Sequence, residues 1–206
     1  SGSASVLCGD GSPHTEPPPR TSTEHCLMPK IVDHAAQRAA LLNQSFFLFA
    51  DKGYAALSMR NLAHELGVST GTLYHYFASK EAMFDQMVAW LTERDILQAT
   101  ADFTPDAPPE EWLQLVFEWV RSNEVYLQKM LLLVFDFQRH RNEPQAHALI
   151  ATATSRYRET FCEMVGCGNV GWSVLLGMLI QGLLESSSHN PEEHLAALAS
   201  IAQWSP

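Results

Sequence analysis

The 206-residue sequence predicts an all-α protein. Apolar residues recur at three- and four-residue steps along most of the chain, which is the spacing of one face of an α-helix. No stretch of any length alternates apolar and polar residues as a half-buried strand does, and no internal repeat is visible. Apolar residues make up 46% of the chain, so a sizeable core can form.

Residues 1–27 differ from the rest of the chain. They are rich in Ser, Gly, Pro and Thr and have almost no apolar periodicity. Three consecutive prolines at positions 17–19 are incompatible with a helix. A segment of this composition cannot bury enough apolar surface to fold. We therefore predict a disordered tail over residues 1–27.

Four helices are predicted between residues 31 and 99. The apolar pattern begins at Ile31 and continues to Gly53, a residue that suits the positive φ at a helix end. Ser58, Ser69 and Ser79 can each N-cap the helix that follows. These helices cover Met59–Leu66, Thr70–Tyr76 and Lys80–Ala99. The two short helices are separated by about three residues that include a Gly, which is the outline of a helix-turn-helix.

Prolines at 105, 108 and 109 separate these helices from a second helical region. Further helices are predicted over residues 110–122, 123–138, 143–165, 169–187 and 191–204. The segment 169–187 is apolar on nearly all sides, so we expect it to be buried. Its longest nearly apolar run is shorter than the roughly 20 residues of a membrane-spanning helix. The N-terminus also lacks a signal-peptide pattern, so we expect a cytoplasmic protein.

Enzymatic motifs are missing from the sequence. It contains no G-x-G-x-x-G, H-E-x-x-H or G-x-S-x-G motif. The cysteines, Cys8, Cys26, Cys162 and Cys167, have no C-x-x-C spacing, and with the histidines they form no recognised metal-binding pattern. We expect free thiols in a reducing compartment, no metal, no cofactor and no catalytic residue.

The charge is distributed unevenly. The formal net charge is −10, yet residues 28–92 hold five Lys or Arg and five Asp or Glu. An acidic chain is a poor general binder of polyanions. If the protein contacts nucleic acid, it must do so through a local surface in this neutral segment.

The third predicted helix has the residue types of a surface that approaches DNA closely. In a helix-turn-helix, the second helix lies in the major groove and its N-terminal residues contact base edges. Short side chains at Ser69, Thr70, Gly71 and Thr72 let the backbone come near. Gly71 costs about 1 kcal/mol of helix propensity, which indicates that close approach outweighs this cost.

The remaining residues of this region have two predicted roles. Leu73 and Phe77, four residues apart, should anchor the helix to a small core. Polar groups that follow or flank them can donate to phosphate oxygens, which fixes the position of the protein on DNA without reading sequence. These are Tyr74, His75, Tyr76 and, in the first turn of the next helix, Lys80.

About forty residues, from Phe49 to Val88, carry the pattern F-x-x-x-G-Y followed by S-x-R-x-L-A-x-x-L-G-V-S-x-G-T-L-Y-x-Y-F-x-S-K-E-x-x-F. This pattern resembles the DNA-binding domain of the tetracycline-repressor (TetR) family. The resemblance implies a homodimer, usually a repressor, that binds a palindromic DNA operator and is released by a small-molecule effector. It divides the chain into a DNA-binding domain over residues 28–78 and a ligand-binding and dimerisation domain over residues 79–206.

Carried over by position, the resemblance assigns individual residues. Thr70, Gly71 and Thr72 would face bases, and Arg60 would reach a phosphate or a groove edge. The backbone or adjoining base edges would be contacted by Ser69, Tyr74, His75, Tyr76 and Lys80. Core packing of the two tyrosines and a plain surface role for His75 and Arg60 are alternatives. A helical sensor of the same fold that no longer binds DNA is the alternative function.

The C-terminal residues supply candidates for two further surfaces. Apolar side chains could line a ligand pocket, with core packing as the alternative: Trp112, Phe117, Trp119, Tyr126, Met130 and Phe135. The last two predicted helices could form the dimer interface, as they do in the family, with an internal core role as the alternative. The candidates there are Trp172, Leu176, Leu179, Leu183, Leu195 and Leu198.

Overall fold

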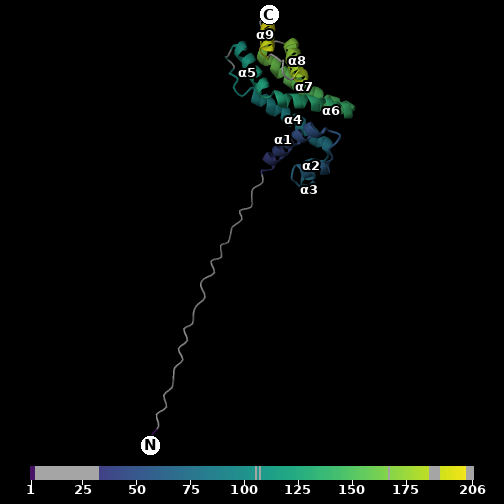
Figure 1. Ribbon diagram of the computed structural model, residues 1–206, viewed down its shortest axis with the longest axis vertical. Coiled ribbons are helices and arrows are strands. Elements are labelled where there is room, and N and C mark those ends of the chain that lie inside the picture. Colours follow the sequence, from purple (N-terminus) through teal and green to yellow (C-terminus); the bar gives the residue numbers. More distant parts are fainter. Residues whose placement is uncertain (3–32, 105, 107, 167, 186–190, 203–206) are drawn as a thin grey trace. The chain divides into compact units, whose positions relative to one another are not determined.

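A computed structural model describes residues 1–2, 33–104, 106, 108–166, 168–185 and 191–202 (Figure 1). The chain divides into two compact units, Ser1–Val32 and Asp33–Pro206. The predicted tail over residues 1–27 belongs to the first unit and, after residue 2, lies outside the described residues, together with Cys8 and Cys26. Cys167, in the second unit, also lies outside them. The helices all belong to the second unit.

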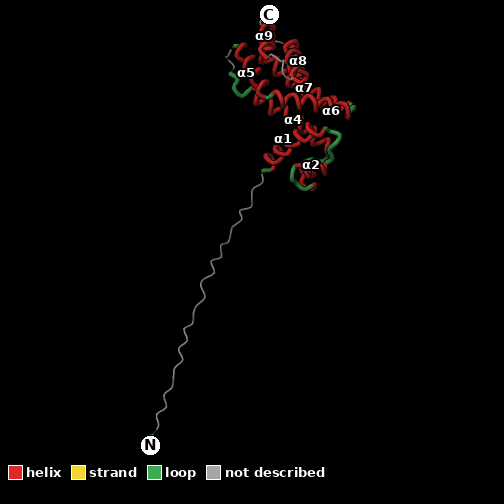
Figure 2. Tube along the Cα trace, viewed as in Figure 1, coloured by secondary structure: helices red, strands yellow, loops and turns green. Residues whose placement is uncertain are grey.

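All regular secondary structure in the described residues is helical, which confirms the predicted fold class (Figure 2). The second, third and fourth helices begin at their predicted caps, whereas the first begins at His34 with Asp33 as its N-cap, a residue that the sequence analysis did not single out. The Ser58, Ser69 and Ser79 side chains each accept a backbone N–H of the helix that follows, and Gly53 ends the first helix with φ 84°. The bounds are α1 (His34–Lys52), α2 (Met59–Glu65), α3 (Thr70–Tyr76) and α4 (Lys80–Ala99).

The second helical region also follows the sequence pattern. Prolines occupy the first turns of α5 and α7, where the missing N–H has no helical partner to lose. Only Asn123 separates α5 from α6, and its Nδ2 donates to the Trp119 carbonyl oxygen at 2.8 Å. The bounds are α5 (Pro109–Ser122), α6 (Glu124–His140), α7 (Pro144–Val165), α8 (Gly168–Glu185) and α9 (Pro191–Ala202).

None of the described helices is by itself both long enough and apolar enough to cross a bilayer. Taken together, the bent pair α7 and α8 meets the same criteria of length and composition.

Two apolar cores hold the helices together. The first core contains side chains of α1, α2, α3, α4, α6 and α7, and the second contains side chains of α5, α7, α8 and α9. In the first core the rings of Phe84 on α4 and Phe137 on α6 stack with centroids 4.2 Å apart. The core beneath α2 and α3 therefore continues into α6. The predicted division between residues 78 and 79 stays a prediction.

A polar cluster, here called the Tyr54 junction, fastens the turn after α1 to α4 and α6. It consists of Tyr54, Lys80, Asp136 and Arg141. The Tyr54 backbone N–H donates to Asp136 Oδ2 at 2.8 Å, and Arg141 Nη1 donates to the Tyr54 hydroxyl at 2.9 Å. Lys80 Nζ donates to the Tyr54 carbonyl oxygen at 3.0 Å. These hydrogen bonds tie α6 and its C-terminal end directly to the segment that precedes α2.

We predict that Asp136→Ala lowers the free energy of unfolding by about 1.5 kcal/mol, because it leaves the Tyr54 N–H without its charged acceptor. Urea unfolding followed by circular dichroism measures the change. Asp136→Asn is the matched control, since it keeps an acceptor oxygen and should lose less. Equal losses in both variants would show that the hydrogen bond is not the source of the effect.

Candidate nucleic-acid interface and internal cavity

The helix-turn-helix is held by its own short-range contacts. Gly67, with φ 67°, forms the turn between α2 and α3, where a residue with a Cβ would be strained. Ser69 Oγ accepts the Thr72 N–H at 2.9 Å and lies 2.8 Å from Thr72 Oγ1. Leu73 and Phe77 are buried, at 0% and 1% exposed. The structure therefore places both predicted anchors in the core.

The opposite face of α3 is open to solvent. Tyr74 is 51% exposed, and Thr72 is half-buried beside the Ser69 hydroxyl. A Cβ at Gly71 would meet only Ser69 Oγ, at 3.8 Å, so the space in front of this backbone is free. The other exposed candidates are Ser69, Thr70, His75 and, on α2, Arg60. Their predicted contacts with DNA stay predictions.

Two predicted DNA contacts already have partners within the chain. The Tyr76 hydroxyl donates to Gln37 Oε1 at 2.8 Å and lies 2.9 Å from His34 Nδ1. Lys80 donates to the Tyr54 carbonyl, and burial lowers the pKa of its ammonium. The Tyr76 hydroxyl thus links α3 to α1, and the Lys80 ammonium links α4 to the turn after α1.

The first turn of α1 is a part of this surface that the sequence reasoning missed. The rings of His34 and His75 lie 6.1 Å apart, so the exposed start of α1 stands beside the end of α3. The partners are more than thirty positions apart in the sequence, as the Tyr76–Gln37 separation of 39 illustrates. Local spacing contains no signal for such a contact.

A cavity of about 340 Å³ lies among α4, α6, α7 and α8. Its wall also includes Phe46 of α1 and Trp119 and Val120 of α5. Three of the predicted pocket residues line it: Trp119, Met130 and Phe135. The other three lie elsewhere. Trp112 donates to the Thr104 carbonyl at 3.1 Å, Phe117 belongs to the second core, and the Tyr126 hydroxyl enters a polar network described below.

The predicted dimer residues are also divided by the structure. Trp172, Leu176 and Leu179 line the cavity, and Leu198 is 1% exposed within the second core. Leu183 and Leu195 are half-buried. The exposed apolar side chains of α8 are Val170, Ile180 and Leu184.

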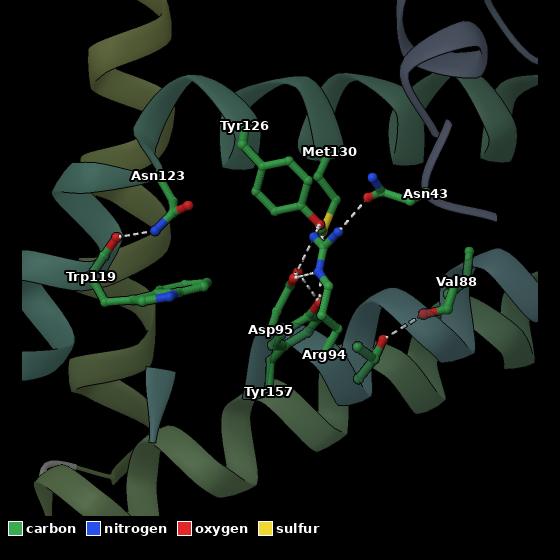
Figure 3. A network of polar contacts seen from close by, with 10 residues as sticks. Asn43, Val88, Arg94, Asp95, Trp119, Asn123, Tyr126, Met130 and Tyr157 are labelled. Carbon is green, nitrogen blue, oxygen red and sulfur yellow. Dashed lines mark hydrogen bonds and ion pairs between the residues drawn. The ribbon is translucent and has the colours of Figure 1, made fainter. Parts of the chain in front are cut away.

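Figure 3 shows a buried polar network, here called the Asp95 network. One of its members, Tyr157, also lines the cavity. Asp95 is 1% exposed, and its Oδ1 accepts Arg94 Nε at 2.9 Å and Nη2 at 2.6 Å. Its Oδ2 accepts the hydroxyls of Tyr126 at 2.8 Å and Tyr157 at 2.9 Å. Arg94 Nη1 also donates to Asn43 Oδ1 at 2.6 Å. The network therefore joins α1, α4, α6 and α7.

Alkaline pH should weaken this structure. Burial raises the pKa of Tyr54 to about 12, and burial, followed by the Asp95 charge, also raises the pKa of Tyr126 and Tyr157. The unfolded chain releases these protons from about pH 10, whereas the folded chain keeps them. Above about pH 10 the folded state therefore binds more protons than the unfolded state. The free energy of unfolding should then be constant below about pH 10 and decrease as the pH rises above it.

Urea midpoints measured between about pH 8 and about pH 11 test this prediction. The wild-type midpoint should be flat at the lower end and fall at the upper end. Tyr157→Phe removes one of the titrating hydroxyls, so its midpoint should fall less steeply. A wild-type midpoint that stays constant over the whole range would contradict the prediction.

The comparisons with known proteins agree with this arrangement. The model of the family "Bacterial regulatory proteins, tetR family" matches residues 41–87, which run from α1 through the helix-turn-helix into α4. PksA of Bacillus subtilis, an HTH-type transcriptional regulator, is 30% identical over 108 residues, which are 50% of this chain and 51% of PksA. The chain thus spans about half the length of that relative.

Two further comparisons extend over most of the chain. The HTH-type transcriptional repressor Rv1474c of Mycobacterium tuberculosis is 27% identical over 186 residues, covering 83% of this chain and 95% of the repressor. A Saccharomonospora viridis protein crystallised with choline has the same fold, with a TM-score of 0.64 and 17% identity over 82% of this chain and 97% of that one. Residues 41–87, which contain the helix-turn-helix, thus match the TetR family of bacterial regulatory proteins, and the fold of the described residues is similar to that of solved transcriptional regulators.

Proposed function

We propose that the protein is a homodimeric transcriptional repressor that binds a palindromic DNA operator and is released by a small-molecule effector. Repression is inferred from the likeness to Rv1474c, a repressor. Its place of action would be the cytoplasm, where bacterial DNA lies. The observation that carries the proposal is the solvent-facing N-terminal half of α3, fixed from behind by buried Leu73 and Phe77.

The chemistry of this face suits the major groove. Short side chains and Gly71 let the α3 backbone approach base edges, and the Tyr74 hydroxyl can donate to a phosphate oxygen. Residues 28–92 carry equal numbers of acidic and basic residues, so few counterions would be released on binding. We therefore expect operator affinity to fall with salt along a shallow slope.

The effector would act through α4. This helix begins at Lys80, beside α3, and further along it lines the cavity with Met87, Leu91 and Thr92. Helix α6 lines the same cavity and holds the Tyr54 junction. A ligand that prefers one position of α4 and α6 would change the spacing of two recognition helices, which must stay near 34–36 Å, about one helical turn of DNA.

A second copy would cover the exposed apolar side chains of α8. Ile180 is 42% exposed and Leu184 is 76% exposed, and Leu132 of the neighbouring α6 is 51% exposed. Side chains of this kind on adjacent helices mark contact surfaces. Sedimentation of the wild type and of Leu184→Glu tests this assignment. The wild type should be a dimer, and the variant should already dissociate into monomers at protein concentrations at which the wild type stays dimeric.

The main experiment is fluorescence anisotropy of labelled duplexes from the DNA upstream of the protein's own gene, titrated at several salt concentrations. Saturable binding to a palindromic segment, at two chains per duplex, is the expected result. If no upstream duplex binds, selection from random duplexes finds an operator located elsewhere. Failure of that selection as well would favour the sensor that no longer binds DNA.

A further inference from the structure

We propose that the cavity accepts an uncharged, mainly apolar molecule with one neutral hydrogen-bonding end, and that it discriminates against carboxylates and quaternary ammonium ions. This inference rests on the proposed effector role of the cavity and adds the chemical class of the ligand. It follows from three features of the cavity wall: the lack of ionisable side chains among the described lining residues, the positions of the free hydrogen-bonding groups, and the packing of the aromatic rings.

The wall of the cavity lacks ionisable charge. Among the described residues that line it, none is Asp, Glu, Lys, Arg or His. The nearest buried charge, Asp95, is shielded, because its oxygens accept Arg94, Tyr126 and Tyr157. An ion entering the cavity would therefore lose its hydration and find no opposite charge, which disfavours its binding.

Apart from the indole N–H groups of Trp119 and Trp172, the wall has four polar side chains, which differ in what they can offer. Thr92 already donates to the Val88 carbonyl at 2.8 Å, and Tyr157 donates to Asp95 Oδ2 at 2.9 Å. Gln138 and Thr154 line the cavity, and their side chains make no hydrogen bond to any other described residue. Thr154 is exposed and Gln138 is half-buried, so they form the outer part of the wall. A neutral hydroxyl or carbonyl can bond to these two groups while its apolar part lies deeper.

Two of the aromatic rings that line the cavity are engaged with rings outside the wall. A cage for a cation needs several ring faces directed at the ammonium group. Phe84 stacks on Phe137 at 4.2 Å, and Phe46 packs against Tyr126 at 4.9 Å, so these two rings pack against other rings. The Saccharomonospora viridis protein has the same fold and was crystallised with choline, a quaternary ammonium ion. We propose a different ligand class, an uncharged molecule, for the cavity of this chain.

Isothermal titration of the full chain with n-octanol, octanoate and octyltrimethylammonium tests the inference, because the three probes share one alkyl chain. We expect n-octanol to bind at least tenfold more tightly than either ion. Gln138→Arg adds a cation to the outer wall and should make octanoate the preferred probe. Ala153→Phe, which fills the cavity, should abolish n-octanol binding, and circular dichroism checks that this variant is folded.

Each outcome supports or overturns the inference. Equal affinity for the three probes, stronger binding of either ion, or binding of none would overturn it. Undiminished n-octanol binding by folded Ala153→Phe would place the ligand elsewhere and overturn it as well. Operator binding, measured on the same preparation by anisotropy, separates the two claims. Operator binding without n-octanol preference contradicts only the ligand class, whereas the preference without any operator contradicts only the DNA-binding function.

Discussion

Asp95→Ala should destabilise the protein by about 3–5 kcal/mol, the cost of leaving a buried charge without its partner. The carboxylate is 1% exposed and accepts four hydrogen bonds, from Arg94, Tyr126 and Tyr157. Alanine would leave the partly buried hydroxyls of Tyr126 and Tyr157 without their carboxylate acceptor, and the Arg94 guanidinium would keep only Asn43 and Tyr126 as partners. Urea unfolding followed by circular dichroism measures the loss.

The neighbouring residue Glu93 provides the matched control. Its carboxylate accepts Arg156 Nη2 at 2.8 Å, but both side chains are more than half exposed, at 59% and 52%. Exposed ion pairs contribute about 0–1 kcal/mol, so Glu93→Ala should change little. Similar losses in Asp95→Ala and Glu93→Ala would mean that burial of the Asp95 network contributes nothing.

A double variant separates the charge from the packing. Asp95→Leu combined with Arg94→Leu removes both charges, so no buried ion is left unpaired. Its loss should be smaller than the sum of the two single losses, because contacting residues are not additive. Additive losses would show that the residues act independently, and the network would then not be the joint that holds α1, α4, α6 and α7 together.

The helices could be predicted because their signals are local. Ser58, Ser69 and Ser79 cap within three residues of themselves, and α4 covers the predicted range, Lys80–Ala99. The faces of α8 could not be predicted for the opposite reason. This helix is apolar on nearly all sides, so periodicity does not distinguish Leu179, which lines the cavity, from Leu184, which is 76% exposed.

The Asp95 network and the Tyr54 junction could not be predicted from the sequence for another reason. Arg94 and Asp95 stand next to each other in a charged stretch that looks like a solvated helix surface. Their burial depends on Tyr126 and Tyr157, which are 31 and 62 positions from Asp95. The Tyr54 junction is similar, because the N–H of Tyr54 meets a carboxylate 82 positions away. Only the packing of helices brings such groups together.

Gly71→Ala should have opposite effects on stability and on DNA binding. Alanine improves helix propensity by up to about 1 kcal/mol, and the new Cβ would meet only Ser69 Oγ at 3.8 Å. The free energy of unfolding should therefore rise. If α3 enters the major groove, the same methyl group holds its backbone away from the bases. Operator affinity, measured by anisotropy, should then fall by about tenfold, which corresponds to 1.4 kcal/mol.

Tyr74→Ala completes this test at the same helix. Tyr74 is 51% exposed, so its removal should leave the urea midpoint almost unchanged while operator affinity falls by about tenfold or more. Val125→Ala is the control, since Val125 is 68% exposed on α6 and should affect neither quantity. If Gly71→Ala and Tyr74→Ala both bind the operator as tightly as the wild type, the exposed face of α3 is not the surface that reads DNA. Because Gly71→Ala is expected to be more stable than the wild type, its loss of affinity could not be attributed to unfolding.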